Sequence, residues 1–162
     1  MGKERGEHGK RDSKKVEKYA DKIKSEKRQA KEDADKIRPI LEKDPDWPLV
    51  AGIKKPDTQE ECDRERRAQT RLTKKAVQLL YPEYKALSCH GTGTAHYWVH
   101  VNIVMPEKPE YAESRKIIER ADMMLEQVGI KYGGYLPDSL PGKDEWTPCL
   151  TVVINDLMWG GY

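Results

Sequence analysis

The chain of 162 residues has the length of one domain of ordinary size with an appendage. Charged residues make up 36% of it and hydrophobic residues another 36%, so much of the chain must be solvated. A net charge of +2 excludes a protein that is strongly basic throughout, and neither a bilayer-spanning run nor a secretory signal is recognisable, which predicts a cytoplasmic protein.

The three cysteines, Cys62, Cys89 and Cys149, are odd in number and widely spaced, unlike the framework of a disulfide-rich secreted domain. None stands in a Cys-X-X-Cys pair, which argues against a structural zinc site. The sequence therefore predicts neither a bound metal nor another cofactor.

The N-terminal part is predicted to be a disordered tail over residues 1–11 and a charged helical arm over residues 12–43. The tail contains three glycines and no apolar side chain after Met1, a composition typical of disorder. In the arm, apolar residues recur every seven positions and a weaker set follows four positions after each. The two sets are Val16, Ile23, Ala30 and Ile37, and Ala20, Lys27, Ala34 and Leu41. A stripe over residues 16–41 could pair with a protein partner, with another copy of the chain, or with the protein's own body, which we favour because small side chains bury little area.

The charges of this region are uneven. From Lys3 to Lys31 there are twelve Lys or Arg residues against six Asp or Glu residues, a local excess of +6. A basic segment on a near-neutral body can contact phosphate groups, although a solvated helix surface is the commoner role of such a pattern.

A turn-rich linker over residues 44–57 is predicted to join the arm to a domain over residues 58–162. Pro39 should interrupt the helix of the arm, because proline disfavours helical geometry in the preceding residue and lacks an N–H group. Apolar residues of the linker should anchor it to the core. They are Trp47, Leu49, Val50 and Ile53.

Residues 58–162 are predicted to form an α+β domain with the element order α-β-β-α-β-β. Four strands in one sheet with two helices on one face is the economical packing for this order. Pro109 suits the first turn of the second helix, and Gly129 suits its C-terminal cap. The predicted strands are residues 84–90, 96–105, 130–136 and 149–155, with residues 91–95 as the turn of a hairpin.

The first helix of this domain is predicted to begin at a capping box formed by Thr58 and Glu61 and to end at Tyr81 and Pro82. Its predicted core face comprises Cys62, Ala68, Leu72, Ala76, Leu79 and Leu80. Basic residues on its other side are candidate phosphate contacts. They are Arg66, Arg67, Arg71, Lys74 and Lys75.

The hairpin carries three of the four histidines of the chain. Side chains of a strand alternate between the two faces of a sheet, and the set with Val99, Val101 and Ile103 should face the helices. If Leu87 and Cys89 also point inward, the other face displays His90, His96, Trp98, His100 and Asn102. An open face of this kind predicts binding of single-stranded nucleic acid by base stacking. A cover formed by the arm or by the Trp47 linker would instead make Trp98 part of a second small core.

Clustered histidines also suggest a metal site or an enzyme. His96 and His100 are separated by about 13 Å along a strand, which is too far for both to bind one ion. No Asp or Glu stands between Lys85 and Pro106 to complete a ligand set. A small enzyme that uses the histidine face and acids of a later loop stays an alternative, although nothing in the spacing requires it. Those acids are Asp138, Asp144 and Glu145.

Residues 76–103 (AVQLLYPEYKALSCHGTGTAHYWVHVNI) resemble small α+β domains carried by phages, plasmids and some archaea. The features in common are a helix that ends near Tyr81-Pro82, the turn over residues 91–95, and a strand that contains Trp98-Val99. These domains often have glycine before the tryptophan, where this chain has Tyr97. They have no assigned chemistry, so the resemblance implies a mobile-element or nucleoprotein context and identifies no catalytic residue.

These observations favour a non-enzymatic, nucleic-acid-associated module. A protein-interaction adaptor that uses the N-terminal helix and a small enzyme that uses the histidine face are the alternatives. The predicted nucleic-acid-binding residues are Trp98, His96, His100 and His90 on the sheet, and Arg66, Arg67, Arg71, Lys74 and Lys75 on the helix.

Overall fold

The computed structural model describes residues 2–90, 99–107, 109–132 and 150–155, with residues 2–12 and 151 described by their backbone. Within these residues the chain forms α1 (Gly2–Leu41), α2 (Trp47–Val50), α3 (Gln59–Leu80), β1 (Lys85–His90), β2 (Val99–Val104), α4 (Tyr111–Val128) and β3 (Leu150–Ile154). The protein is α+β, but the predicted four-stranded sheet with two helices is wrong. The described residues form a three-stranded sheet and four helices, and most of them are helical.

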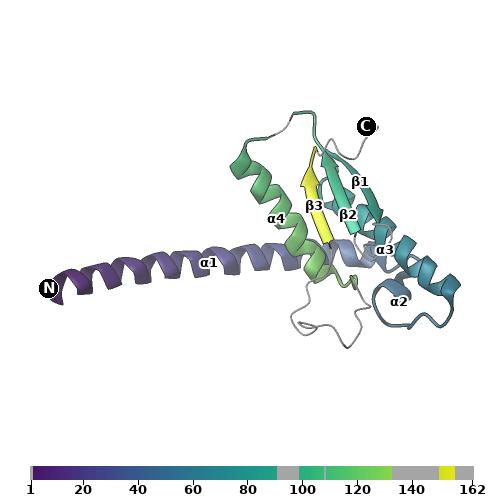
Figure 1. Ribbon diagram of the computed structural model, residues 1–162, viewed down its shortest axis with the longest axis horizontal. Coiled ribbons are helices and arrows are strands. Elements are labelled where there is room, and N and C mark those ends of the chain that lie inside the picture. The colour runs from purple at the N-terminus through teal and green to yellow at the C-terminus, as the bar shows by residue number, and fades with distance from the viewer. Residues whose placement is uncertain (1, 91–98, 108, 133–149, 156–162) are drawn as a thin grey trace.

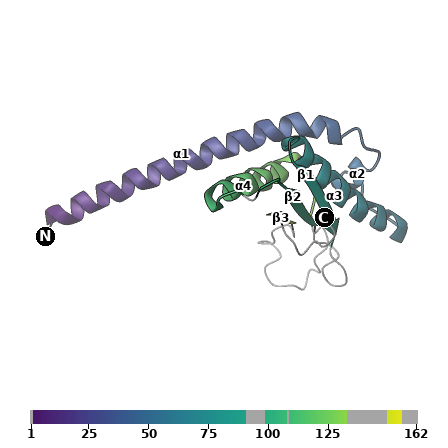
Figure 2. The ribbon, with the colours of Figure 1, turned by 90° about the horizontal axis from the view of Figure 1, so that it is seen from above.

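The sheet has the strand order β1-β2-β3 and mixes two kinds of pairing. β1 and β2 are antiparallel, whereas β2 and β3 are parallel and are joined through α4. α3 and α4 lie on one face of the sheet, and α1 packs on the outer side of these two helices (Figures 1 and 2). The fold therefore has three layers, with the sheet and α1 on the outside.

The predicted strand over residues 130–136 is not formed where the structure describes it, at residues 130–132. The backbone N–H of Lys131 donates to the carbonyl oxygen of Val50, at 2.7 Å, and its carbonyl oxygen accepts from Nε2 of Gln69, at 2.6 Å. The hydroxyl groups of Tyr132 and Thr73 lie 2.7 Å apart in a buried hydrogen bond. These contacts satisfy the polar groups of the segment through α2 and α3, so they replace pairing with a neighbouring strand.

α3 begins as the sequence predicts. The side chain of Thr58 accepts a hydrogen bond from the backbone N–H of Glu61, at 3.1 Å. The buried face differs from the predicted one, because it includes polar Gln69 and Thr73, whereas Cys62 is exposed. Both polar side chains are hydrogen-bonded to residues 131–132, which removes the cost of burying them.

α4 ends at Gly129, which has φ of +103° and caps the helix in the left-handed region, as predicted. Arg38 of α1 stabilises this end. Its Nε donates to the carbonyl oxygen of Val128, at 3.0 Å, and its Nη2 donates to that of Gln127, at 2.6 Å. Carbonyl groups in the last turn of a helix lack intrahelical donors, and a cationic donor also suits the negative end of the helix dipole.

α1 begins earlier than the sequence predicts, and Pro39 does not interrupt it. Residues 2–11, predicted to be a disordered tail, are helical, since extending an existing helix avoids a new nucleation step. Pro39 lies within the last turn and the helix continues to Leu41. Proline removes only one hydrogen bond there, and the side chain of Arg38 is held by α4.

One core contains residues from the arm, the linker and the domain. Ala34, Ile37 and Leu41 of α1 are buried together with Trp47 and Val50. Ile53, predicted to belong to this anchor, is 74% exposed. The C-terminal part of α1 therefore packs on the body, and only its N-terminal part extends away from it (Figure 1).

Candidate nucleic-acid interface

The inward face of β1 is the one opposite to the prediction. Ser88 pairs with Val101 and therefore shares the face of Val101, which is fully buried beneath the helices. The hydroxyl group of Ser88 donates to the carbonyl oxygen of Thr70 in α3, at 3.0 Å. The expectation that Leu87 and Cys89 point inward is wrong, because α3 packs against the small side chains of Ala86 and Ser88.

This register separates two of the candidate histidines. His90 pairs with Val99 and lies on the helix-facing side, whereas His100 pairs with Cys89 on the other side. The described strands therefore do not bring His90 and His100 onto one face. His96, Trp98 and the turn over residues 91–95 lie outside the described residues. So do the other residues considered for this region, Asp138, Asp144, Glu145 and Cys149.

The face of the sheet away from the helices is not open at its central strand. Asn102 lies on that face and is 0% exposed, and His100 is half-buried. Both residues have interaction partners. The two covers predicted from the sequence, the helical arm and the Trp47 linker, do not account for this burial. Trp47 belongs to the main core, and α1 lies on the opposite side of α3 and α4 (Figure 2).

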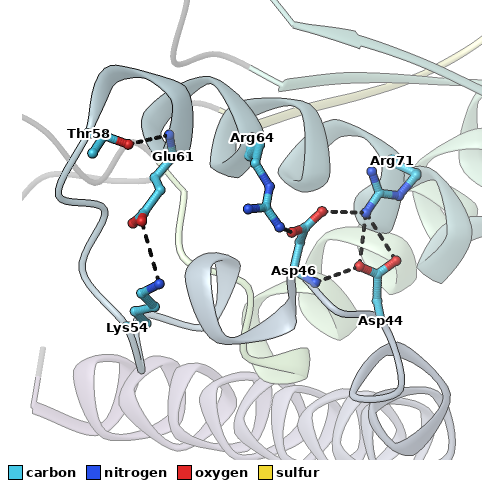
Figure 3. A network of polar contacts seen from close by, with 7 residues as sticks. All are labelled: Asp44, Asp46, Lys54, Thr58, Glu61, Arg64 and Arg71. Carbon is cyan, nitrogen blue, oxygen red and sulfur yellow. Dashed lines mark hydrogen bonds and ion pairs between the residues drawn. The ribbon is translucent and has the colours of Figure 1, made fainter.

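The basic side of α3 is partly occupied by ion pairs with the segment that precedes α2 (Figure 3). Nη2 of Arg71 lies 2.9 Å from Oδ1 of Asp44 and 3.3 Å from Oδ2 of Asp46. Arg64 also pairs with Asp46. Burial by itself would raise the pKa of Asp46, but the hydrogen bonds from Arg64 and Arg71 outweigh it and lower that pKa. Arg71 therefore has a structural role besides its predicted contact with phosphate.

The other candidate residues of α3 divide into two groups. Arg66 is half-buried and lies 3.6 Å from Asp63, and its buried Nε atom has no hydrogen-bond partner among the residues that the structure describes. Arg67, Lys74 and Lys75 are exposed. Within the described residues these three have no ion-pair partner, unlike Arg66 and Arg71.

A larger group of exposed basic residues lies on the N-terminal part of α1. We define the α1 arm as residues 13–29, which precede the first buried residue, Ala30. The arm has seven Lys or Arg residues against three Asp or Glu residues. All seven basic side chains are exposed, and they are Lys14, Lys15, Lys18, Lys22, Lys24, Lys27 and Arg28. Within the described residues only Lys22 of this group has an ion-pair partner, Glu26, at 3.9 Å.

The root of the α1 arm is fixed to α4 by a buried carboxylate. Asp33 is 6% exposed and accepts two hydrogen bonds from Arg120. Burial would raise the pKa of Asp33, but the hydrogen bonds from Arg120 and Gln29 outweigh it and lower that pKa. The guanidinium group of Arg120 lies 5.9 Å from the ring centre of Tyr81, whose pKa burial raises to about 12. This contact could not be predicted from the sequence, because an aspartate in a segment rich in charged residues is typical of solvated surface.

A pocket of about 240 Å³ lies between the α1 arm and α4. It combines three acidic side chains with apolar ones from both helices. The lining residues are Tyr19, Lys22, Ile23 and Glu26 of α1, and Glu119, Asp122 and Met123 of α4. Burial raises the pKa of Asp122 to about 6, and Glu126 adds to this effect.

The described part of the chain contains no group of three His, Cys, Asp or Glu side chains placed to hold a metal ion. None of its helices is both long and apolar enough to span a membrane. Comparisons with protein-family models, with curated proteins and with solved structures give no match for this chain. The candidate interface therefore rests on the charges and geometry of its own residues.

Proposed function

We propose that this protein is a non-enzymatic nucleic-acid-binding module that contacts the phosphate backbone through the α1 arm. The observation that supports this most directly is the excess of exposed Lys and Arg on a helix that extends away from the body (Figure 1). Basic side chains that lack protein partners can replace the cations around a nucleic acid, and the release of those cations drives binding. In the described residues, that condition holds for six of the seven basic residues of the arm.

The α1 arm is a better candidate for nucleic-acid binding than the outer face of the sheet. Stacking of bases needs exposed rings, and the described part of the outer sheet face has a fully buried Asn102 and a half-buried His100. The arm offers charge instead of rings, apart from Tyr19, which is 66% exposed. Binding should therefore depend on phosphate density and little on base sequence. On α3, Arg67, Lys74 and Lys75 are secondary candidates for the same contact.

The test is the salt dependence of binding to a labelled duplex and a labelled single strand. One variant neutralises four arm residues through Lys14→Gln, Lys15→Gln, Lys18→Gln and Lys24→Gln. A matched variant neutralises four exposed lysines of the body through Lys43→Gln, Lys55→Gln, Lys85→Gln and Lys131→Gln. The arm variant should lower the slope of log K against log salt by up to about 3 to 4 for duplex, while the body variant changes it little.

An equal decrease of this slope in the two variants would show that binding depends on net charge alone. That result would overturn the assignment of the phosphate contact to the α1 arm. Absence of binding by the wild type at low salt would overturn the proposed function. A third variant, Trp98→Ala, examines the sheet. If this variant alone abolishes binding to the single strand, the binding surface is the sheet and the proposal for the arm is wrong.

A further inference from the structure

Tyr19 presents an aromatic ring to solvent within the basic α1 arm, and its side chain is 66% exposed. Residues three and four positions apart are neighbours on the surface of a helix. Because a helical turn takes 3.6 residues, the neighbours four before and three after Tyr19 fall on one side of it. These are Lys15 and Lys22, and both are exposed. On the other side, three before and four after, lie the apolar residues Val16 and Ile23.

The ring also borders a hollow between two helices. Tyr19, Ile23 and Met123 belong to the lining of the pocket of about 240 Å³ between the α1 arm and α4. The same lining contains carboxylate groups, among them those of Glu119 and Asp122. These groups repel phosphate, whereas the lysines on the other side of Tyr19 attract it. An anionic ligand at Tyr19 must therefore turn its negative charge towards the lysines and its uncharged part towards the ring and the pocket.

A nucleotide of a single strand is divided in this way. Its phosphate group is anionic, and its unpaired base has a flat face that can stack on an aromatic side chain. Every base has such a face, so stacking of this kind depends little on sequence. In a duplex the bases are stacked on one another inside the double helix, where a side chain on the surface of a protein helix does not reach their faces.

We propose that Tyr19 is a stacking site for an unpaired base, with Lys15 and Lys22 binding the phosphate groups next to that base. The inference rests on the proposed function, because the same α1 arm supplies the cations. It adds a class of substrate, since a single strand gains a contact that a duplex lacks. Charge alone favours the duplex, which has more phosphate groups per unit length, and stacking on Tyr19 reduces that advantage.

Tyr111 is the matched residue for comparison, because it is 80% exposed and lies at the start of α4, outside the α1 arm. Of the residues that follow it by three and four positions, Ser114 and Arg115, only Arg115 is basic. Arg115 pairs with Glu119 at 3.1 Å, whereas Lys15 beside Tyr19 has no ion-pair partner in the part of the chain that the structure describes. Tyr111 therefore has an exposed ring without an unpaired cation beside it.

The test is the dissociation constant for three labelled ligands at one moderate salt concentration. They are a single strand, the same strand without its bases, and a closed duplex without free ends. Tyr19→Ala should weaken binding to the single strand about 5- to 100-fold, because the loss of one aromatic contact with a base has an effect of this size. Its binding to the other two ligands should change by less than about twofold, because the charges of the arm are unchanged. Alanine favours helix, so circular dichroism should show that the arm stays helical.

Tyr19→Phe keeps the ring and should bind all three ligands like the wild type, and so should Tyr111→Ala. Stacking at Tyr19 would be overturned, and the phosphate contact left standing, by either of two results. One is a Tyr19→Ala variant that loses no affinity for the single strand, or loses as much for the duplex. The other is a Tyr19→Phe variant as weak as Tyr19→Ala. A wild type that binds none of the ligands at low salt would instead overturn the proposed function itself.

Discussion

Arg120 of α4 donates Nε to Oδ2 of Asp33 at 2.9 Å and Nη2 to Oδ1 at 3.0 Å, across 87 positions of sequence. This two-point contact joins the outer helix to the helix layer. Asp33 lies between the buried Ala30 and Ile37, close to the residues at which the α1 arm leaves the body. The ion pair therefore fixes α1 to α4 near the root of the α1 arm.

Replacing Asp33 should lower the free energy of unfolding. Asp33→Ala removes two charge-assisted hydrogen bonds and leaves Arg120 without its partner, at a cost of about 1–3 kcal/mol. Urea denaturation measures the difference. Asp35→Ala is the control, because Asp35 is an exposed carboxylate paired with Arg38 at 3.2 Å, and such pairs contribute roughly 0–1 kcal/mol. Equal effects of the two substitutions would contradict the structural role of Asp33.

The contribution of Asp33 to stability should also depend on pH. Since the pKa of Asp33 is below its ordinary value of 3.8, this contribution is present above about pH 4 and is lost as the pH falls further.

Asp122 should give the opposite dependence on pH. Its pKa in the folded protein is about 6, above the ordinary 3.8, so the folded state binds the proton more tightly and stability falls as the pH rises from about 4 to 6. Asp122→Asn removes the charge and should stabilise the protein at pH 8 by about 1 kcal/mol, after allowance for solvent screening of a half-buried group. This increase in stability should be smaller at pH 4.5. Urea midpoints at the two pH values measure it, and a gain independent of pH would refute the explanation by charge.

Asn155 should contribute to stability although it lies beyond the end of β3. It has φ of +47°, and its Oδ1 accepts from the N–H of Met105 at 2.8 Å while its Nδ2 donates to the Met105 carbonyl oxygen at 3.2 Å. The side chain thereby extends the pairing of β2 and β3 by one step. Asn155→Gly keeps the backbone conformation and removes both bonds, with an expected loss of about 1–2 kcal/mol. Thermal unfolding should give the highest Tm for the wild type and the lowest for Asn155→Gly. Asn155→Asp, which retains the acceptor, should have an intermediate Tm. An unchanged Tm for Asn155→Gly would disprove the contribution.

Arg71 and Lys74 of α3 should differ in their contribution to stability, because only Arg71 is held in ion pairs. Arg71→Ala removes the ion pairs with Asp44 and Asp46 and should cost about 1 kcal/mol of stability. Lys74→Ala removes an exposed side chain and should leave stability within about 0.5 kcal/mol. Urea denaturation of both variants, with duplex binding measured in parallel, provides the comparison. If Lys74→Ala were the more destabilising substitution, the assignment of the two roles would be reversed.

Features whose cause lies within a few residues could be predicted from the sequence. The start of α3 follows from Thr58 and Glu61, because the cap is a hydrogen bond between neighbours. The end of α4 follows from Gly129, because its left-handed conformation suits glycine. The inward set of β2 follows from alternation, and Val99, Val101 and Ile103 are buried as predicted.

Features that depend on partners distant in sequence became visible only in the folded structure. The inward face of β1 depends on the close packing of α3, which accepts Ala86 and Ser88 where local hydrophobicity favoured Leu87. Residues 130–132 contact α2 and α3, so their apolar composition did not produce a strand. Asp33 is buried because Arg120 lies opposite it, and no local pattern of charges reveals a partner 87 positions away. A burial pattern can be read from one segment, but the group that satisfies a buried polar atom is known only once the segments are packed together.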